Sequence, residues 1–339
     1  MAAASDESYI TELYRILLGR TPLKDELDHW TTQIQNGLSD RQLLWCFVDS
    51  SEYKAKHSIV PGHPVGHYYS PVIDPDEARK FWRDKSALPP QALAGISISI
   101  PAMMEFWNKL KPILATTNFP AKQGQNSRYF FDNNVFPIGD AAILRAIIGT
   151  VRPKRIIEVG SGFSSACMLD ALDEFAMNET TLLFIEPYPE RLHQLLHTND
   201  WKRTTLIEGP VQSVDLAVFD ELVERDILFI DSSHVLKACS DVAFELFEIL
   251  PRLKPGVLIH FHDIHYPFEL PSEWIFEAKY SWNEVYALRA FLMYNTTFRI
   301  LAFNSLFDQM RRQNIADTAP QMLHNPGASI WLEKCATDG

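Results

Sequence analysis

Five short apolar segments between residues 155 and 263 constrain the fold more than any other feature of the chain. They read RIIEVG, TLLFIEP, TTLIEG, DILFIDS and GVLIHFHD, and runs with helical spacing separate them. Short apolar strands that alternate with helices predict a parallel sheet covered by helices on both faces. We therefore expect an α/β, Rossmann-like doubly wound sheet in the second half of the chain.

Two further strands, TFRILAF and ASIWLEK, follow these five, and we expect a loop rather than a crossover helix between them. Adjacent strands without a crossover usually pair antiparallel. The predicted sheet thus has seven strands, five parallel and a C-terminal antiparallel pair. This ending differs from a dinucleotide dehydrogenase, in which the second half repeats the βαβ pattern.

The rest of the chain divides by pattern into two shorter parts. Residues 1–57 carry helix-spaced apolar positions, with Gly19 placed to end one helix and Ser39 placed to cap another. They predict a small all-α domain. Residues 58–127 begin rich in Pro and Gly and are expected to form a linker and cap segment, which leaves residues 128–339 as the α/β domain.

Charge and cysteine content exclude several classes of protein. The net charge of -12 and the isoelectric point near 5.4 argue against a nucleic-acid partner held by its phosphates. The four cysteines form no CxxC pair, so neither a zinc ribbon nor a disulfide framework is indicated. The start of the chain does not read as a signal peptide, and no apolar run approaches the roughly 20 residues that span a bilayer. We expect a cytoplasmic protein.

A glycine-rich turn follows the first predicted strand. Gly160 and Gly162 fit G-x-G, but Ser165 stands where the dinucleotide fingerprint has its third glycine. Glu186 ends the second strand, where a carboxylate can accept both hydroxyl protons of a ribose. Glu158, just before the turn, suits a cationic ligand without phosphate, S-adenosylmethionine, better than a pyrophosphate; it could instead hydrogen-bond the loop.

The motifs IIEVGSGFSS, FIEPYPERL, LFIDSSH, LPRLKPGVLIHFHDI, WNEVYALRAFL and ASIWLEK together carry a resemblance that covers about residues 128–335. This region resembles a bacterial class I S-adenosylmethionine-dependent methyltransferase, and within that superfamily the group found beside sugar and polysaccharide biosynthesis. The resemblance implies a ribose contact at Glu186 and an adenine neighbour at Gln212. The full donor site that it implies is Glu158, Gly160, Ser161, Gly162, Ser164, Glu186 and Gln212.

The N-terminal run YRILLGRTP…SSEY resembles a short bacterial domain of unknown function that is related in pattern to phycobilisome-linker repeats. This resemblance implies no chemistry. We expect a packing or docking module, through which the chain could bind a protein partner or form a homo-oligomer.

Polar residues follow the fourth and fifth predicted strands. Asp231 ends the fourth strand with His234 three residues later, and His262 and Asp263 end the fifth. Because the carboxyl ends of neighbouring strands face one crevice, these groups should converge. They could assist attack by a hydroxyl, which needs a base, a metal ion, or both. His260, within the fifth strand, is expected only to pack.

This arrangement resembles metal-dependent sugar O-methyltransferases of macrolide pathways. The resemblance implies that Asp231, His262 and Asp263 bind a divalent cation, Mg²⁺ or similar, and that His234 is the base. His262 stands where that group has Glu, which lowers the affinity for Mg²⁺, so a metal-free His–Asp base remains open.

The sequence therefore predicts an O-methyltransferase acting on a hydroxyl of a sugar, glycan or related small molecule, with His234, Asp231 and Asp263 as catalytic residues. Trp274 and Trp282 could border the acceptor site or could simply pack. An amine or phenol acceptor remains open. A further alternative is a non-catalytic nucleoside-binding scaffold that recruits a glycan-assembly partner.

Overall fold

The computed structural model describes residues 2–57, 66–67, 69–124 and 127–336. The chain divides into two compact units, Met1–Ala78 and Arg79–Gly339, and each is described by itself. Among the described residues, every helix is too short or too polar to cross a membrane.

The first unit is helical, as predicted. It contains α1 (Ala2–Leu18), α2 (Lys24–Gln35), α3 (Asp40–Asp49) and α4 (Ser51–His57). α1 ends where Gly19 takes a φ of +59°, and the Ser39 side chain accepts from the backbone of Gln42 to cap α3. Its core is apolar and buried, with the Tyr14 and Phe47 rings edge to face 4.9 Å apart.

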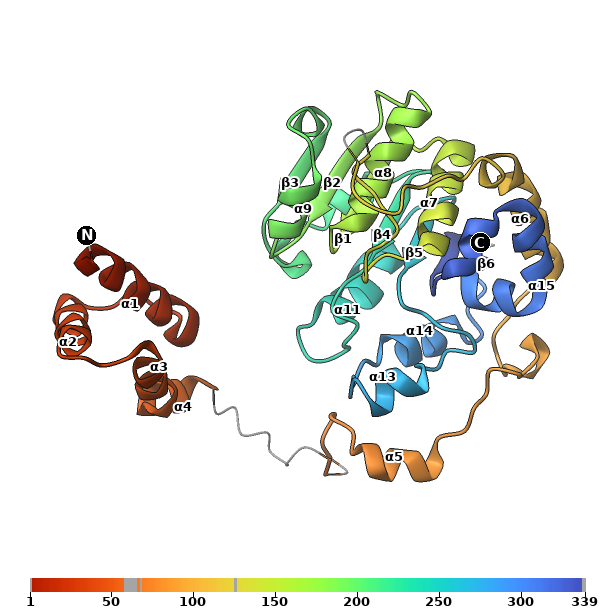
Figure 1. Cartoon of the computed structure of the whole chain (residues 1–339). Coiled ribbons are helices and arrows are strands. Elements are labelled where there is room, and N and C mark those ends of the chain that lie inside the picture. The colour runs from red at the N-terminus through yellow and green to blue at the C-terminus, as the bar shows by residue number, and fades with distance from the viewer. Residues whose placement is uncertain (1, 58–65, 68, 125–126, 337–339) are drawn as a thin grey trace. The chain divides into compact units, whose positions relative to one another are not determined.

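The second unit is built on a seven-stranded sheet in the order β3-β2-β1-β4-β5-β7-β6 (Figure 1). The first five strands run parallel, and β7 pairs antiparallel with both β5 and β6. The predicted fold class is thereby confirmed. The strands are β1 (Arg155–Val159), β2 (Thr181–Ile185), β3 (Thr204–Ile207), β4 (Ile227–Ile230), β5 (Leu258–Phe261), β6 (Phe298–Phe303) and β7 (Ile330–Lys334).

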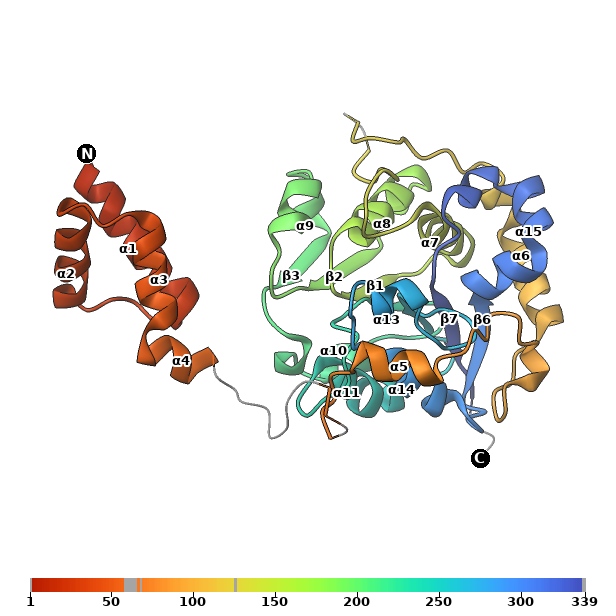
Figure 2. The same ribbon diagram turned by 60° about the horizontal axis from the view of Figure 1, so that its bottom comes forward.

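Helices cover the sheet on two sides. α7 and α8 lie on one side, and α11 and α14 lie on the other (Figure 2). The helices after α4 are α5 (Pro75–Phe81), α6 (Ile100–Leu114), α7 (Ile138–Val151), α8 (Phe163–Glu174), α9 (Glu190–Leu195), α10 (Ala217–Asp220), α11 (Asp241–Phe244), α12 (Leu250–Arg252), α13 (Ser272–Phe276), α14 (Glu284–Leu292) and α15 (Asn304–Thr318). Short 3₁₀ turns occupy Pro90–Ala92, Asp200–Lys202, Val211–Ser213 and Pro320–His324, and a π turn occupies Glu245–Ile249.

The prediction of a loop between β6 and β7 was wrong, because α15 occupies most of that connection. Its apolar pattern is weak, since only a few of its residues are buried and Arg311 breaks it with a φ of -138°. A helix with a short, interrupted apolar stripe gives little periodic signal. The two strands nevertheless pair antiparallel, as predicted.

The strand register brings the candidate site together. Val159 pairs with Ile230, and Ile230 pairs with Phe261, so β1, β4 and β5 end side by side. β4 and β5 are buried along their whole length, as expected for strands covered on both faces. Within β5, His260 stacks on Phe229 at 3.8 Å between ring centroids and is fully buried, so it packs.

Candidate active site

The glycine turn between β1 and α8 requires glycine at its first position. Gly160 has a φ of +81°, and a Cβ there would lie 1.7 Å from the carbonyl oxygen of Asp231. The Gly160 N–H donates to Ile185 O at 3.0 Å, and Asp231 N–H donates to Val159 O at 2.9 Å. The ends of β1, β2 and β4 are thus held in direct backbone contact, with no room for a side chain at Gly160.

Glu186, at the end of β2, points its carboxylate at the turn. Its Oε2 accepts from the backbone N–H of Ser161 at 2.9 Å, and its Oε1 accepts from Tyr188 N–H at 2.8 Å. Each carboxylate oxygen can accept more than one hydrogen bond. The side chain is therefore held in place and still has acceptor capacity for a ligand hydroxyl.

A cavity of about 420 Å³ opens at these strand ends. Four of the predicted site residues line it: Gly160, Glu186, Gln212 and Asp231. The rest of its wall consists of Val159, Ile185, Pro187, Tyr188, Pro210, Val211, Ser232, Ser233, Lys237, Cys239, Ser240 and Asp241. The residues that follow β1, β2, β3 and β4 therefore share one cavity, as the parallel topology requires.

The remaining predicted donor residues lie in or under the turn rather than in the cavity wall. Glu158 is fully buried and accepts from the hydroxyl of Ser165, whose oxygen accepts from Gly162 N–H at 2.9 Å. Ser161 and Ser164 are also buried. Among the described residues, Glu158 Oε1 has no hydrogen-bond partner. Burial raises the pKa of Glu158 to about 8, although nearby serine hydroxyls oppose the shift.

The predicted catalytic residues form one cluster at the ends of β4 and β5. His234 Nε2 lies 3.5 Å from Asp231 Oδ1 and 3.6 Å from Asp263 Oδ2. His262 Nε2 lies 3.6 Å from Asp263 Oδ1, in a fully buried position. His234 and Asp263 have φ angles of +60° and +55°. Strained backbone of this kind is typical of active sites.

The cluster shifts the ionisation of its members. Burial lowers the pKa of His234, but the Asp231 and Glu284 carboxylates outweigh it, so the net pKa lies well above the ordinary range. Burial would raise the pKa of Asp231, but the charge of His262 and the contact with His234 lower it overall. Burial raises the pKa of Asp263 despite His262. At neutral pH the resting site thus places an imidazolium against at least one carboxylate.

Comparison with known proteins identifies the second unit. Residues 157–264 match a family described as a methyltransferase domain. The chain is also 32% identical over 173 residues to an uncharacterized protein of Archaeoglobus fulgidus, covering 48% of this chain and 75% of the relative. The second unit therefore carries a methyltransferase domain. Residues 1–57 of this methyltransferase match a domain of unknown function, DUF4214.

Solved structures of other methyltransferases are similar to this methyltransferase at low identity. A putative O-methyltransferase from Klebsiella pneumoniae is 16% identical with a TM-score of 0.38, covering 75% of this chain and 94% of that one. The O-methyltransferase TomG from Streptomyces achromogenes is 11% identical with a TM-score of 0.39, covering 71% and 92%. Similarity at this level carries no information on acceptor or mechanism.

Sequence reasoning missed one member of the cluster around His234. Glu284, the first residue of α14, is 1% exposed, and its Oε2 lies 2.8 Å from His234 Nδ1. The sequence motif WNEVYALRAFL marks α14 as a core helix, and its buried face contains Val285 and Leu288 as expected. An acidic residue at a helix start is common for local reasons, so no sequence signal connects Glu284 to His234.

The predicted metal site finds no support in the methyltransferase. In the described ranges, no group of three His, Cys, Asp or Glu side chains has an arrangement that could hold a metal ion. Asp231 and Asp263 both face His234 Nε2, so the imidazole supplies positive charge where a cation would. His262 is fully buried and faces Asp140 as well as Asp263. Asp231, His262 and Asp263 therefore do not form a set of ligands that fits a metal ion.

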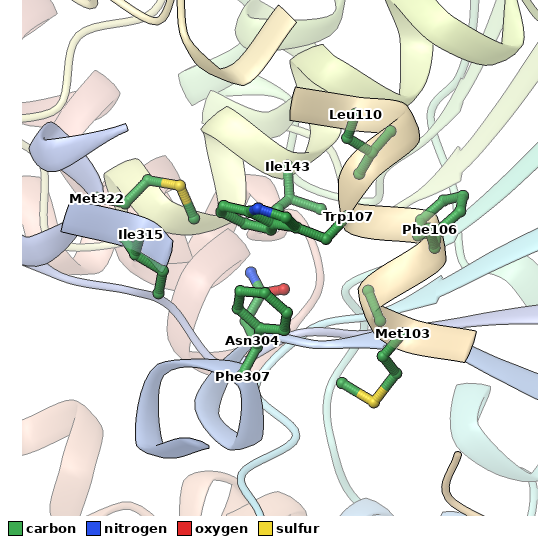
Figure 3. A pocket seen from close by; sticks show the side chains of 10 residues that line it. Met103, Phe106, Trp107, Leu110, Ile143, Asn304, Phe307, Ile315 and Met322 are labelled. Carbon is green, nitrogen blue, oxygen red and sulfur yellow. The ribbon is translucent and has the colours of Figure 1, made fainter. Parts of the chain in front are cut away.

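A second cavity in the methyltransferase lies in an apolar layer between α6 and α15 (Figure 3). It has room for about 20 Å³, and its walls include Trp107 and Phe307, whose rings stack 4.4 Å apart. Its polar side chain, Asn304, already donates to Asp140 at 2.7 Å. A space of roughly one water molecule with apolar walls is a packing gap rather than a ligand site.

Proposed function

We propose that the chain transfers a methyl group from S-adenosylmethionine to a hydroxyl of a sugar, glycan or related small molecule, with His234 as the base. The observation that carries the proposal is the position of His234 Nε2, between Asp231 and Asp263 and beside the cavity that Asp231 lines. One imidazole nitrogen thereby lies next to the space expected for the donor.

The donor would be held by the turn and by Glu186. Glu186 keeps acceptor capacity for ribose hydroxyls, and Gln212 lines the part of the cavity beyond β3. When bound, the donor supplies a methyl group that the acceptor oxygen displaces from the sulfonium sulfur, giving a methyl ether, S-adenosylhomocysteine and one proton. The chain's own residues must remove that proton and align the acceptor.

His234 can remove the proton only as a neutral imidazole. Because its pKa is raised, the ring must first lose the proton from Nε2, and the resulting base is stronger than an ordinary histidine. We therefore expect kcat/KM to rise with pH through a pKa above 6.5, the ordinary value. Asp231 and Asp263 would stabilise the imidazolium formed after each transfer.

Aromatic rings border the His234 ring and support a sugar-like acceptor. Trp282 lies 4.5 Å from the His234 ring between centroids, Tyr280 stacks on Trp282 at 4.4 Å, and Trp274 lies edge-on to Trp282 at 5.4 Å. Trp274 and Trp282 are only half-buried, and Tyr280 is exposed. Partly exposed aromatic rings suit the apolar faces of a pyranose, with its hydroxyls directed elsewhere.

The test combines donor binding with transfer. Calorimetry measures binding of S-adenosylmethionine, and mass spectrometry detects methylation of a panel of sugars, phenols and amines. His234→Ala should lower kcat by roughly 10²–10⁴-fold, the usual contribution of a general base, with little change in donor affinity. Normal turnover in that variant would remove His234 as the base.

Other outcomes distinguish the alternatives. Methylation restricted to phenols or amines would replace the sugar acceptor, and donor binding without any transfer would favour a scaffold. Loss of transfer on adding EDTA, with donor binding intact and activity restored by Mg²⁺, would show a metal-assisted reaction. Full activity in EDTA is the outcome that the His234 cluster predicts.

A further inference from the structure

Glu284 is a buried carboxylate whose side chain is hydrogen-bonded to one histidine, His234. It is 1% exposed, and its Oε2 lies 2.8 Å from His234 Nδ1. Its other oxygen, Oε1, has no hydrogen-bond partner among the described residues. A carboxylate removed from water is unfavourable unless it is paired, so the contact with His234 is what makes this position tolerable.

The two ring nitrogens of His234 face different partners. Nδ1 faces Glu284, while Nε2 faces Asp231 and Asp263 at the strand ends. A carboxylate accepts hydrogen bonds and does not donate them, so Glu284 keeps the proton on Nδ1. Nε2 is then the nitrogen that is free to exchange a proton with an acceptor.

The carboxylate is not needed to fasten α14 to the loop that carries His234. The backbone N–H groups of Asn283 and Glu284 both donate to His234 O, at 3.0 and 3.1 Å. The Asn283 side chain accepts from Leu236 N–H at 2.5 Å and donates to Leu236 O at 3.1 Å. These four bonds already fix the loop to the helix. The remaining task for the Glu284 side chain is to orient the His234 ring.

We propose that Glu284 is the positioning residue for His234: it fixes the tautomer and the rotation of the imidazole, so that Nε2 faces the acceptor side. This inference rests on the proposed role of His234 as base and extends it to a residue on α14. Glu284 acts through His234 and has no contact with the reacting atoms. The arrangement has the same division of tasks as a base held by an orienting acid.

Two substitutions test the orientation of the ring. Glu284→Gln keeps the shape but not the charge, and its amide NH₂ can donate to Nδ1 and favour the wrong tautomer, so kcat should fall by about 10⁴-fold. Glu284→Ala removes both, and kcat should fall by about 10³–10⁴-fold, as when the orienting acid of a catalytic histidine is lost. In both variants the KM for the acceptor and the donor Kd should stay close to wild type. Glu105→Gln, the same change at an exposed position on α6, is the matched control and should leave kcat unchanged.

A double-mutant cycle with His234→Ala tests whether the two residues act together. If Glu284 acts through His234, Glu284→Ala should have no further effect on kcat in the His234→Ala background, because residues that act as a unit are not additive. Independent, multiplying losses would overturn the inference and indicate a structural role. So would a wild-type kcat in folded Glu284→Ala.

A spectroscopic measurement keeps the inference testable where residual rates are too small. The hydrogen-bonded Nδ1–H of His234 should give a downfield proton resonance that is present in wild type and absent in Glu284→Ala. Persistence of that resonance in folded Glu284→Ala would overturn the inference. If His234→Ala itself keeps full activity, the proposed base is wrong; if only the Glu284 variants are normal, the positioning role alone fails.

Discussion

Glu158 provides a quantitative test of the donor site. Its carboxyl is buried beneath the glycine turn, and burial raises its pKa to about 8. At pH 7 a group with this pKa is about nine-tenths protonated, whereas an ordinary glutamate would be almost fully ionised. Oε1 has no partner among the described residues, so the positive charge of a donor bound above the turn would act on this carboxyl through the protein and favour its charged form.

Donor binding should therefore release a proton from Glu158. If the donor's cation favours the charged form, binding at pH 7 releases up to about nine-tenths of a proton, and the donor Kd tightens as the pH rises toward 8. Calorimetry in buffers of different ionisation enthalpy measures the release, because the observed enthalpy changes in proportion to the protons that the buffer takes up.

Glu158→Gln is the matched control, since it is isosteric and cannot titrate. The difference in proton release between wild type and this variant equals the number of protons released by Glu158, because any release from His234 is the same in both proteins. A wild-type binding enthalpy that is the same in all buffers would refute the reasoning and leave Glu158 as a structural acceptor for Ser165.

Further predictions concern the turn and a buried ion pair. Gly160→Ala should abolish donor binding and lower the melting temperature, because the new Cβ would lie 1.7 Å from Asp231 O. Gly37→Ala is the control: Gly37 also has a positive φ, but a Cβ there would have nothing within 4 Å, so only the backbone strain of roughly 1–3 kcal/mol is expected. Equal losses in the two variants by thermal unfolding would contradict the close approach at Gly160. Arg128→Ala should lower the free energy of unfolding by roughly 3–5 kcal/mol, because Arg128 Nε donates to buried Asp200 at 2.7 Å. Burial would raise the pKa of Asp200, but Arg128 lowers it overall. The ion pair therefore stabilises the fold above pH 3.8, the pKa of an ordinary Asp, and this stabilisation is lost as the pH falls below that value. If Arg128→Ala lowered the free energy of unfolding in urea by the same amount at pH 3 and pH 6, this prediction would be contradicted.

Much of the candidate site follows from the sequence because it lies at the ends of strands. The apolar runs define β1 to β5, and parallel pairing places the residues after each strand at one edge of the sheet. Gly160, Glu186, Gln212 and Asp231 meet in one cavity for that reason. The close approach of Asp231 to Gly160 also explains why the first glycine matters more than the second.

Other features depend on tertiary packing and leave little trace in the sequence. Glu284 meets His234 because the start of α14 folds back onto the loop after β4, across 50 residues of chain. The depth of Glu158 depends on how α8 and the turn pack over it, so its side chain lies under the turn rather than in the cavity wall. α15 was missed because its apolar stripe is interrupted at Arg311.

The charges around the cavity bear on which ligand it can take. Glu186 and Asp231 line the cavity, and Asp263 stands behind Asp231 next to His234. Burial of Asp231 makes its charge felt more strongly than a surface carboxylate would be. Lys237 also lines the cavity and offsets part of this negative potential. A sulfonium cation would be attracted to the carboxylates that remain. The same carboxylates that hold His234 as an imidazolium thus also favour a cationic donor. One arrangement of charge therefore explains both the preference for a cationic donor and the expected rise of kcat/KM toward higher pH.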